Sequence, residues 1–235
     1  MFQRRILGLT SYYLGATPDL FATKDVHYED VKMAPYQEDI YSYFEDIEEQ
    51  MAQRKRNRDS GSETYKSYTR QSSNFVFPAI SQNVTGENRP RPNKFRLTEK
   101  EAAGIEEGKN KLKLEKGSDK YLHVQQYLKT LEQYISEFDR YLENARNEDK
   151  KTNHTIIDDF KSFVDKYGSK FNDFAESPDK KSKLFTAMYN CSAKMVNIIF
   201  NIMKSPGPTL VYSNYVLMEG LQIFKIYLKY FGFSR

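Results

Sequence analysis

Tryptophan is absent from the 235 residues, and Cys191 is the only cysteine. One cysteine excludes a disulfide within the chain and a metal cluster held by several thiolates. The three histidines, His27, His123 and His154, are scattered without the spacing of metal ligands, so no metal site is predicted. No apolar run approaches the roughly 18 residues of a membrane-spanning helix, and Met1–Thr10 lacks the apolar core of a signal peptide. The sequence therefore predicts a protein that is neither membrane-spanning nor secreted.

The composition is mildly basic. Hydrophobic residues make up 39% of the chain and charged residues 29%, and the net charge is +4 with a pI of about 8.8. This content lies between that of an ordinary globular domain and that of a domain with long solvated segments. A weak positive charge suits a polyanionic partner without identifying one.

Catalytic motifs are not found in the chain. Residues 104–110 read Gly-Ile-Glu-Glu-Gly-Lys-Asn, which is one residue shorter than a phosphate-binding P-loop and lacks its Ser or Thr. The acidic pairs Glu48–Glu49 and Asp158–Asp159 are predicted on the solvent faces of helices. Cys191 has only Lys194 as a basic neighbour, which favours a half-buried structural cysteine over a nucleophile. We therefore predict no catalytic residue and no cofactor site.

Helices are predicted where apolar residues recur every three or four positions. The segments are 35–51, 120–142, 156–174 and 179–203, the last capped by Ser177 and Pro178. Residues 120–142 carry a stripe of two apolar positions in seven, which suits packing against one other helix. The connection 144–152 is short enough for an antiparallel hairpin, with 156–174 as the partner.

Two segments are predicted to be strands. Val26–Met33 alternates apolar and polar residues with one fault in register. Pro208–Asn214 is a short run that is apolar on both faces, as in the middle strand of a parallel sheet. Such a strand needs neighbours on both sides, and the residues after Asn214 suffice for one helix and no second strand. This pattern predicts a piece of a larger protein.

Between these elements, residues 53–117 show little periodicity. The stretch Asn88–Pro92 contains two prolines and cannot be helical, and Asn74–Pro78 is a short apolar island. We expect a mobile, surface-exposed insertion here.

Basic residues in two places are candidate contacts to nucleic-acid phosphates. The second group is followed by Tyr65, Tyr68 and Arg70, and such interleaving suits single strands, on whose bases aromatic rings stack. The alternative is a solvated loop. The candidates are Arg4, Arg5, Arg54, Lys55, Arg56 and Arg58.

Five segments, read in order, resemble the Swi/Snf-type superfamily 2 ATPases. Phe2–Tyr13 is similar to the segment after motif III, and Val26–Tyr41, with Gln37 and Tyr41, to the strand and helix that follow. Thr69–Pro78 resembles the family's LRQICNHP element with its His replaced. Ser192–Met195 resembles the S-x-K start of a later helix, and Pro208–Phe233 resembles motif IV and the helix that follows it. The residues of these segments are most similar to those of helicases of nucleocytoplasmic large DNA viruses, which include relatives of the poxvirus early transcription factor and nucleoside triphosphatase I.

The resemblance implies a site for ATP and Mg²⁺ between two RecA-like lobes of the parent protein. This chain would begin after motif III and end before motifs V and VI, so no ATP, Mg²⁺ or catalytic residue is expected in it. Motif IV lies near bound nucleic acid in that family, which implies phosphate contacts for Ser213 and Asn214. Asn214 could equally cap the following helix, and the two roles are compatible.

The expected fold is mainly α with a few strands: incomplete RecA-like α/β lobes joined by a helical insertion. Residues 1–52 would end the first lobe, 53–119 would form a flexible linker, 120–176 a helical hairpin, and 177–235 the start of the second lobe with motif IV.

Two functions are open from the sequence. The first is a fragment of a viral ATP-dependent helicase or translocase acting in viral transcription, which links the lobes and contacts DNA or RNA. Its further partners would be the rest of the helicase and viral RNA polymerase, in the virion or the viral factory of the host cytoplasm. The alternative is a self-contained helical protein-interaction module without catalytic activity.

Overall fold

A computed structural model describes residues 25–56, 67–98, 101–102, 117–215 and 218–234. The chain divides into a short unit, Met1–Asp30, and a large one, Val31–Arg235. In the short unit, residues 25–30 are extended and exposed. The described residues of the large unit form helices and no strand. None of the described helices is long and apolar enough to cross a bilayer.

The longest element is α5, Asp119–Thr152, which at about 1.5 Å per residue extends for about 50 Å. Ser118 caps its first turn by accepting a hydrogen bond from the backbone N–H of Tyr121, and Asn153 ends it in the left-handed conformation. The predicted stripe is buried, including Leu131, Phe138 and Leu142. The helix prediction for residues 120–142 is confirmed, and the helix continues for ten residues beyond it, 143–152.

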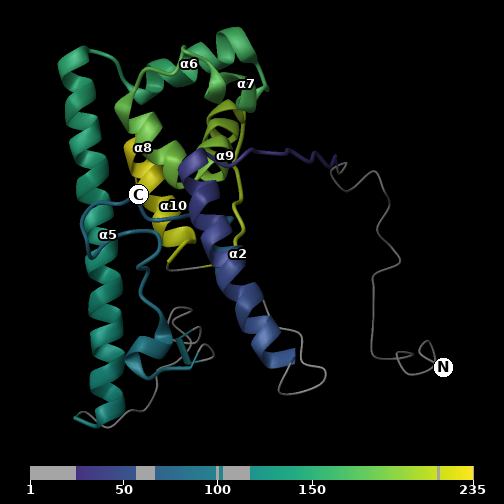
Figure 1. Ribbon diagram of the computed structural model, residues 1–235. Coiled ribbons are helices and arrows are strands. Elements are labelled where there is room, and N and C mark those ends of the chain that lie inside the picture. The colour runs from purple at the N-terminus through teal and green to yellow at the C-terminus, as the bar shows by residue number, and fades with distance from the viewer. Residues whose placement is uncertain (1–24, 57–66, 99–100, 103–116, 216–217, 235) are drawn as a thin grey trace, which may run out of the picture. The chain divides into compact units, whose positions relative to one another are not determined.

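The predicted partner of this helix is wrong. α5 packs against α8, Lys183–Cys191, and against the short 3-10 helix η2, Pro92–Phe95. The residues predicted to return along α5 form α6, Ile156–Tyr167, and α7, Phe171–Glu176, which pack against each other. Figure 1 shows α6 leading away from the C-terminal end of α5 toward α7. A short loop permits a hairpin, but here the apolar face of α5 is covered by elements distant in sequence.

The single helix predicted over 179–203 is two helices. Ser182, not Ser177, caps the first of them, α8, and Ser192 separates it from α9, Ala193–Lys204. The hydroxyl of Ser192 accepts a hydrogen bond from the backbone N–H of Met195, so the break is itself a helix cap. Phenylalanine rings from α6, α7, α8 and α9 meet in the core.

The expected exposed insertion is buried in part. Phe75 and Phe77 are each 1% exposed, and their rings pack edge-on against Phe138 and Tyr134 of α5. α2, Pro35–Arg56, packs against α3, Ser67–Ser72, which precedes this segment. The prediction of a surface-exposed segment is therefore wrong for the residues around Phe75, because large apolar side chains without periodicity can still fill a core.

The two predicted strands are not seen among the described residues. Residues 26–33 are extended without a ladder, and Tyr28 is 92% exposed. The segment 208–214 follows α9 as chain without regular structure; most of it is exposed, with Leu210 95% exposed, while Val211 packs against the core. The helix expected after Asn214 is α10, which spans Leu221–Tyr230 and so does not begin directly after that residue. The incomplete RecA-like lobes therefore remain a prediction.

Candidate functional site

The basic candidates lie mostly outside the part of the chain that the structure describes. Arg4, Arg5 and Arg58 fall outside the described residues. Residues 54–56 form the last turn of α2, with their side chains outside the description. The P-loop-like stretch 104–110 is outside as well. The structure thus locates only Ser213 and Asn214 of the predicted nucleic-acid contacts.

Ser213 and Asn214 lie in the exposed segment after α9. The Ser213 hydroxyl accepts a hydrogen bond from the backbone N–H of Tyr215, with 3.1 Å between nitrogen and oxygen. The hydroxyl of Tyr212 donates to Asn214 Oδ1 across 2.9 Å, while Asn214 itself is exposed. Asn214 does not cap the following helix, because α10 begins at Leu221 with Gly220 at its N-cap position. Its amide group is therefore open to a partner.

Three of the segments that carry the family resemblance meet around Gln37, which is 1% exposed. Its side-chain amide donates to the carbonyl of Ser72 across 3.0 Å and accepts from the backbone N–H of Ala193 across 3.4 Å. The Ser192 hydroxyl donates to the carbonyl of Asn74 across 2.6 Å. One buried glutamine thus joins α2, the end of α3 and the start of α9. We call this contact the junction.

Glu219, which follows the exposed segment, is fixed to the same place. Its carbonyl accepts a hydrogen bond from the side-chain amide of Asn74, and its carboxylate accepts two from the Arg89 guanidinium, one of them 2.9 Å long. The Arg89 and Glu219 side chains are only 6% and 3% exposed. Glu219 has φ 54, a left-handed conformation that costs free energy in a residue with a Cβ atom. Gly220 follows because a Cβ there would lie 2.1 Å from the carbonyl oxygen of Tyr215.

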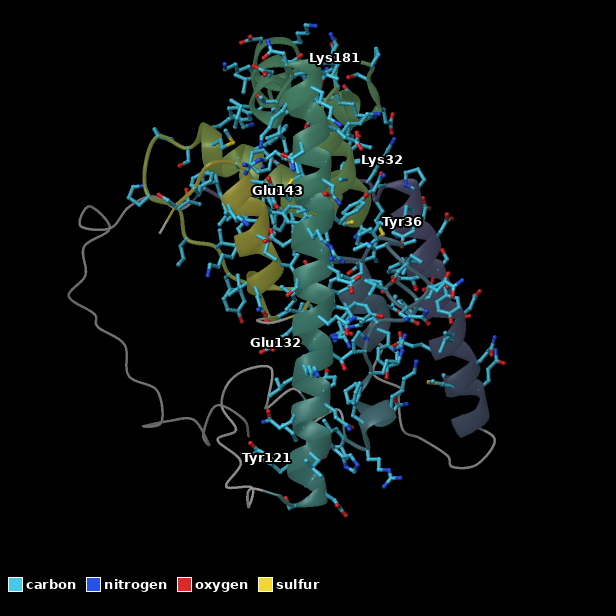
Figure 2. The ribbon with its side chains drawn as sticks, turned by 90° about the vertical axis from the view of Figure 1, so that its left-hand side faces the viewer. Lys32, Tyr36, Tyr121, Glu132, Glu143 and Lys181 are labelled. Carbon is cyan, nitrogen blue, oxygen red and sulfur yellow. The ribbon has the colours of Figure 1, made fainter. Side chains whose placement is uncertain are left out.

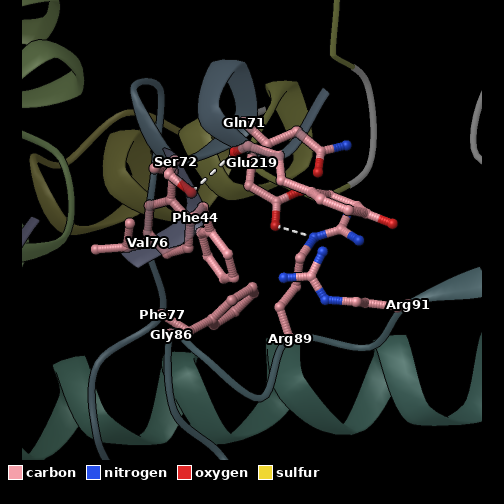
Figure 3. A pocket seen from close by; sticks show the side chains of 11 residues that line it. Phe44, Gln71, Ser72, Val76, Phe77, Gly86, Arg89, Arg91 and Glu219 are labelled. Carbon is pink, nitrogen blue, oxygen red and sulfur yellow. Dashed lines mark hydrogen bonds and ion pairs between the residues drawn. The ribbon is translucent and has the colours of Figure 1, made fainter. Parts of the chain in front are cut away.

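A small pocket lies beside this ion pair (Figure 3). The Arg91 guanidinium stands over the ring of Tyr68, 3.8 Å from its centroid, and 4.5 Å from that of Phe44. Within the described part of the chain, Arg91 Nη1 and Gln71 Oε1 are buried without a hydrogen-bond partner. The cavity measures about 10 Å³, room for about one water molecule.

The charge and size of the pocket decide what it can do. It holds two guanidinium groups, those of Arg89 and Arg91, and one carboxylate, that of Glu219, so its net charge favours an anion or an electronegative atom. Its volume excludes a nucleotide. The simplest occupant is a water molecule that accepts from Arg91 and donates to Gln71. The pocket is therefore part of the packing of the junction.

Titratable groups near the junction are held in their neutral forms. Cys191 is completely buried, and burial raises the pKa of its thiol, so it is a structural cysteine that is more buried than expected. Burial raises the pKa of Tyr36 to about 12, and its hydroxyl donates to the carbonyl of Phe77 across 2.8 Å. The described residues contain no group of three or more His, Cys, Asp or Glu side chains suited to a metal ion.

Arg89 and Glu219 were missed by the sequence analysis. A weak signal is present in the alternation Arg89-Pro90-Arg91-Pro92, because residues before proline are extended and such chain can run along a core. Glu219 carries no signal, since its partner lies 130 residues earlier. Pairing over that separation cannot be read from one sequence.

Comparison with known proteins gives one informative match. The chain is 46% identical, over 237 aligned positions, to "Putative ATP-dependent RNA helicase R350" of Acanthamoeba polyphaga mimivirus. The alignment covers 100% of this chain and 29% of that protein, so the chain spans less than one third of the relative's length. Identity at this level shows that the chain is homologous to this part of the mimivirus protein. No family model and no solved structure matches the chain.

Proposed function

We propose that this chain is the inter-lobe segment of a viral ATP-dependent helicase or translocase. The observation that carries the proposal is the 46% identity along the whole chain to the mimivirus protein. In this proposal the sequence is a Swi/Snf-type superfamily 2 segment, from the end of one RecA-like lobe to motif IV of the next. ATP and Mg²⁺ would bind elsewhere in the parent protein.

The junction supports this role physically. Gln37, Ser72 and Ser192 come from three segments that resemble the family, and their hydrogen bonds are buried. A buried, satisfied polar network fixes the relative positions of the elements that it joins. A connection of this kind can transmit movement between lobes, whereas a loose linker cannot. The domain boundaries at residues 52, 119 and 176 stay predictions.

In the same proposal Ser213 and Asn214 contact the backbone of bound DNA or RNA. The exposed Asn214 amide can donate to a phosphate oxygen, and Ser213 lies next to it on a segment whose far end is fixed by Glu219. The basic run from Arg54 to Arg58 would add phosphate contacts. Viral RNA polymerase and the rest of the helicase are the proposed protein partners, in the virion or the viral factory.

Binding of labelled single-stranded RNA and DNA to the purified chain tests the contact. Loss of two hydrogen bonds to phosphate in Ser213→Ala/Asn214→Ala should weaken binding roughly 5–30-fold. Thr209→Ala, in the same exposed segment, is the matched control and should bind as the wild type does. Equal binding by all three proteins would remove Ser213 and Asn214 from the interface.

Turnover of ATP is the second test. The sequence holds no complete P-loop, so the chain alone should hydrolyse no ATP with or without nucleic acid. Hydrolysis that survives purification to homogeneity would contradict the assignment to an inter-lobe segment. The alternative of a self-contained interaction module is less well supported, because the identity to a protein named as a helicase extends over the whole chain.

A further inference from the structure

Two buried carboxylates organise the end of the helical region where α5 stops and α8 starts. Asp149 of α5 is 3% exposed and accepts hydrogen bonds from the Ser182 hydroxyl at 2.6 Å and from the backbone N–H groups of Lys183 and Leu184 at 2.6 and 3.0 Å. The first turn of α8 is therefore bound to the last turns of α5. The N-terminus of α8, which is the positive end of its helix dipole, is therefore bound by the Asp149 carboxylate.

Asp159 of α6 completes the arrangement. It is fully buried and accepts from the backbone N–H groups of Lys181 and Ser182, each across 3.0 Å. Its Oδ1 also lies 2.6 Å from Nε2 of His154. Both carboxylates therefore make their hydrogen bonds inside the protein. Together they fix the backbone from Lys181 to Leu184 in one position.

This fixed backbone places exposed lysines from two elements at one end of the molecule's long helix. We call the group the basic tip; its members are Lys150, Lys151, Lys181 and Lys183. Lys183 donates its backbone N–H to Asp149, the residue before Lys150, so the two pairs are neighbours. Figure 2 shows Lys181 beside this end of α5, with Tyr121 at the opposite end.

The lysines of the basic tip are not neutralised on the surface. Lys150 donates to Asn147 Oδ1 across 2.8 Å, and none of the four forms an ion pair within the described chain. Glu148 is the exposed carboxylate nearest in sequence. Asp158, whose side chain is 42% exposed, is paired with Lys161 across 3.8 Å, so the four lysines leave an excess of positive charge at the surface. The charges of Asp149 and Asp159 lie beneath it and face N–H and O–H donors.

We infer that the basic tip binds the phosphate backbone of duplex nucleic acid. Lysine ammonium groups are point charges that contact phosphates without reading sequence. Single strands call for exposed aromatic rings, and from 147 to 161 and from 177 to 186 no Phe or Tyr is exposed. The tip therefore suits a double helix.

The basic tip lies at one end of the longest helix of the described chain. It stands at one end of α5, about 45 Å from Asp119 at the other end by the rise of 1.5 Å per residue. This site is separate from Ser213 and Asn214, so it does not rest on the proposed contact there.

Binding of a 25-base-pair DNA or RNA duplex to the 235-residue chain tests the inference, by anisotropy over a range of salt concentrations. The tip variant, Lys151→Gln/Lys181→Gln/Lys183→Gln, changes the three lysines of the tip whose side chains form no hydrogen bond or ion pair within the described chain. Loss of three phosphate contacts should weaken binding at least about tenfold at about 100 mM salt and lower the magnitude of the log–log salt slope by about 2–3. The control variant, with the same change in charge, is Lys94→Gln/Lys129→Gln/Lys225→Gln, and it should keep the wild-type slope.

Three results would overturn the inference. One is an equal salt slope in the tip and control variants, with circular dichroism showing both folded. Another is stronger binding of a single strand than of the duplex, with the same dependence on the three lysines. The third is lysine-dependent binding of poly-glutamate without binding of duplex, which would assign the tip to an acidic protein. Loss of the Ser213 and Asn214 contact leaves the expected result here unchanged.

Discussion

Removal of one partner of the Arg89–Glu219 ion pair should destabilise the fold by about 3–5 kcal/mol, because an unpaired charge would be left buried. The Arg89 guanidinium gives two hydrogen bonds to the carboxylate and a third, 2.8 Å long, to the carbonyl of Pro90. Arg89→Met and Glu219→Gln remove one charge each and keep similar volume. Whole domains are stable by only about 5–15 kcal/mol, so each variant should lose a large share of the stability.

Urea denaturation followed by circular dichroism measures the effect, and the double variant Arg89→Met/Glu219→Gln completes a mutant cycle. Because the double variant leaves no buried charge, its loss should be smaller than the sum of the single losses by about 1–3 kcal/mol. The Lys229–Asp139 pair is the control: its 3.0 Å contact is exposed, with side chains 56% and 38% accessible. Lys229→Ala should cost less than about 1 kcal/mol.

Additive single losses would refute the reasoning, since they would mean that Arg89 and Glu219 contribute independently. Single losses as small as that of Lys229→Ala would show that water reaches the pair and that the junction is open at this point. The test is specific to the pair, because the hydrogen bond from Asn74 to the carbonyl of Glu219 is unchanged in every variant.

Four further results are expected. Tyr36→Phe should cost about 1 kcal/mol by removing the hydrogen bond to Phe77. Burial raises the pKa of Tyr36 to about 12 from the ordinary value of 10, so its contribution is complete below pH 10 and is lost as the pH rises toward 12, and the variant should lose less stability than the wild type in that window. Cys191 should react with a thiol reagent at pH 8 only after unfolding in urea, and fast labelling of the native chain would contradict its burial. Asp149→Asn should lower the free energy of unfolding by about 1–3 kcal/mol in urea melts, because Asn cannot accept all three hydrogen bonds; an unchanged midpoint would argue against the cap. Amides of residues 209–214 should exchange with deuterium within seconds in this chain, and slow exchange there would mean that they are paired.

Helix positions were predictable because the apolar spacing that defines them is local. The apolar spacing of residues 35–51, 120–142 and 156–174 is a property of neighbouring residues. The first two segments are helical throughout, and the third is two helices, α6 and α7, which are separated at residues 168–170. Ends were less certain. Both Ser177 and Ser182 carry a hydroxyl suited to capping, and only the carboxylates of Asp149 and Asp159 decide that the helix starts at Lys183.

Pairing of helices could not be predicted, because it depends on contacts between distant parts of the chain. The stripe on α5 suits any apolar partner of the right length, and α8 takes that place in preference to α6. Phe75 and Phe77 were predicted to lie in an exposed loop, because two apolar residues are too few to show the periodicity of a helix or a strand. Their burial follows from the large apolar area of their rings.

The candidate site likewise has a part that could be predicted from the sequence and a part that could not. Ser213 and Asn214 came from resemblance; in the structure Asn214 is exposed and Ser213 half-buried, and their contact to nucleic acid stays a prediction. The ion pair of Arg89 and Glu219, which fixes the end of that segment, joins residues far apart in the chain and has no local pattern. The basic tip is formed by two lysine pairs that only the folded chain brings together.

A strand over residues 208–214 was expected to need a partner because its backbone groups would otherwise be buried without hydrogen bonds. The exposure of these residues changes that reason. Peptide groups without partners cost about 1–3 kcal/mol each only when buried, and this backbone is open to water, so the chain tolerates the segment alone. Leu210 and Tyr212 are 95% and 84% exposed, which leaves apolar area for a partner to cover. Because Glu219 holds the far end, part of the entropy cost of ordering this segment has been met before any partner binds. The buried Arg89–Glu219 ion pair would thus favour binding of a partner by holding the end of the segment in place, although Arg89 itself contacts no partner.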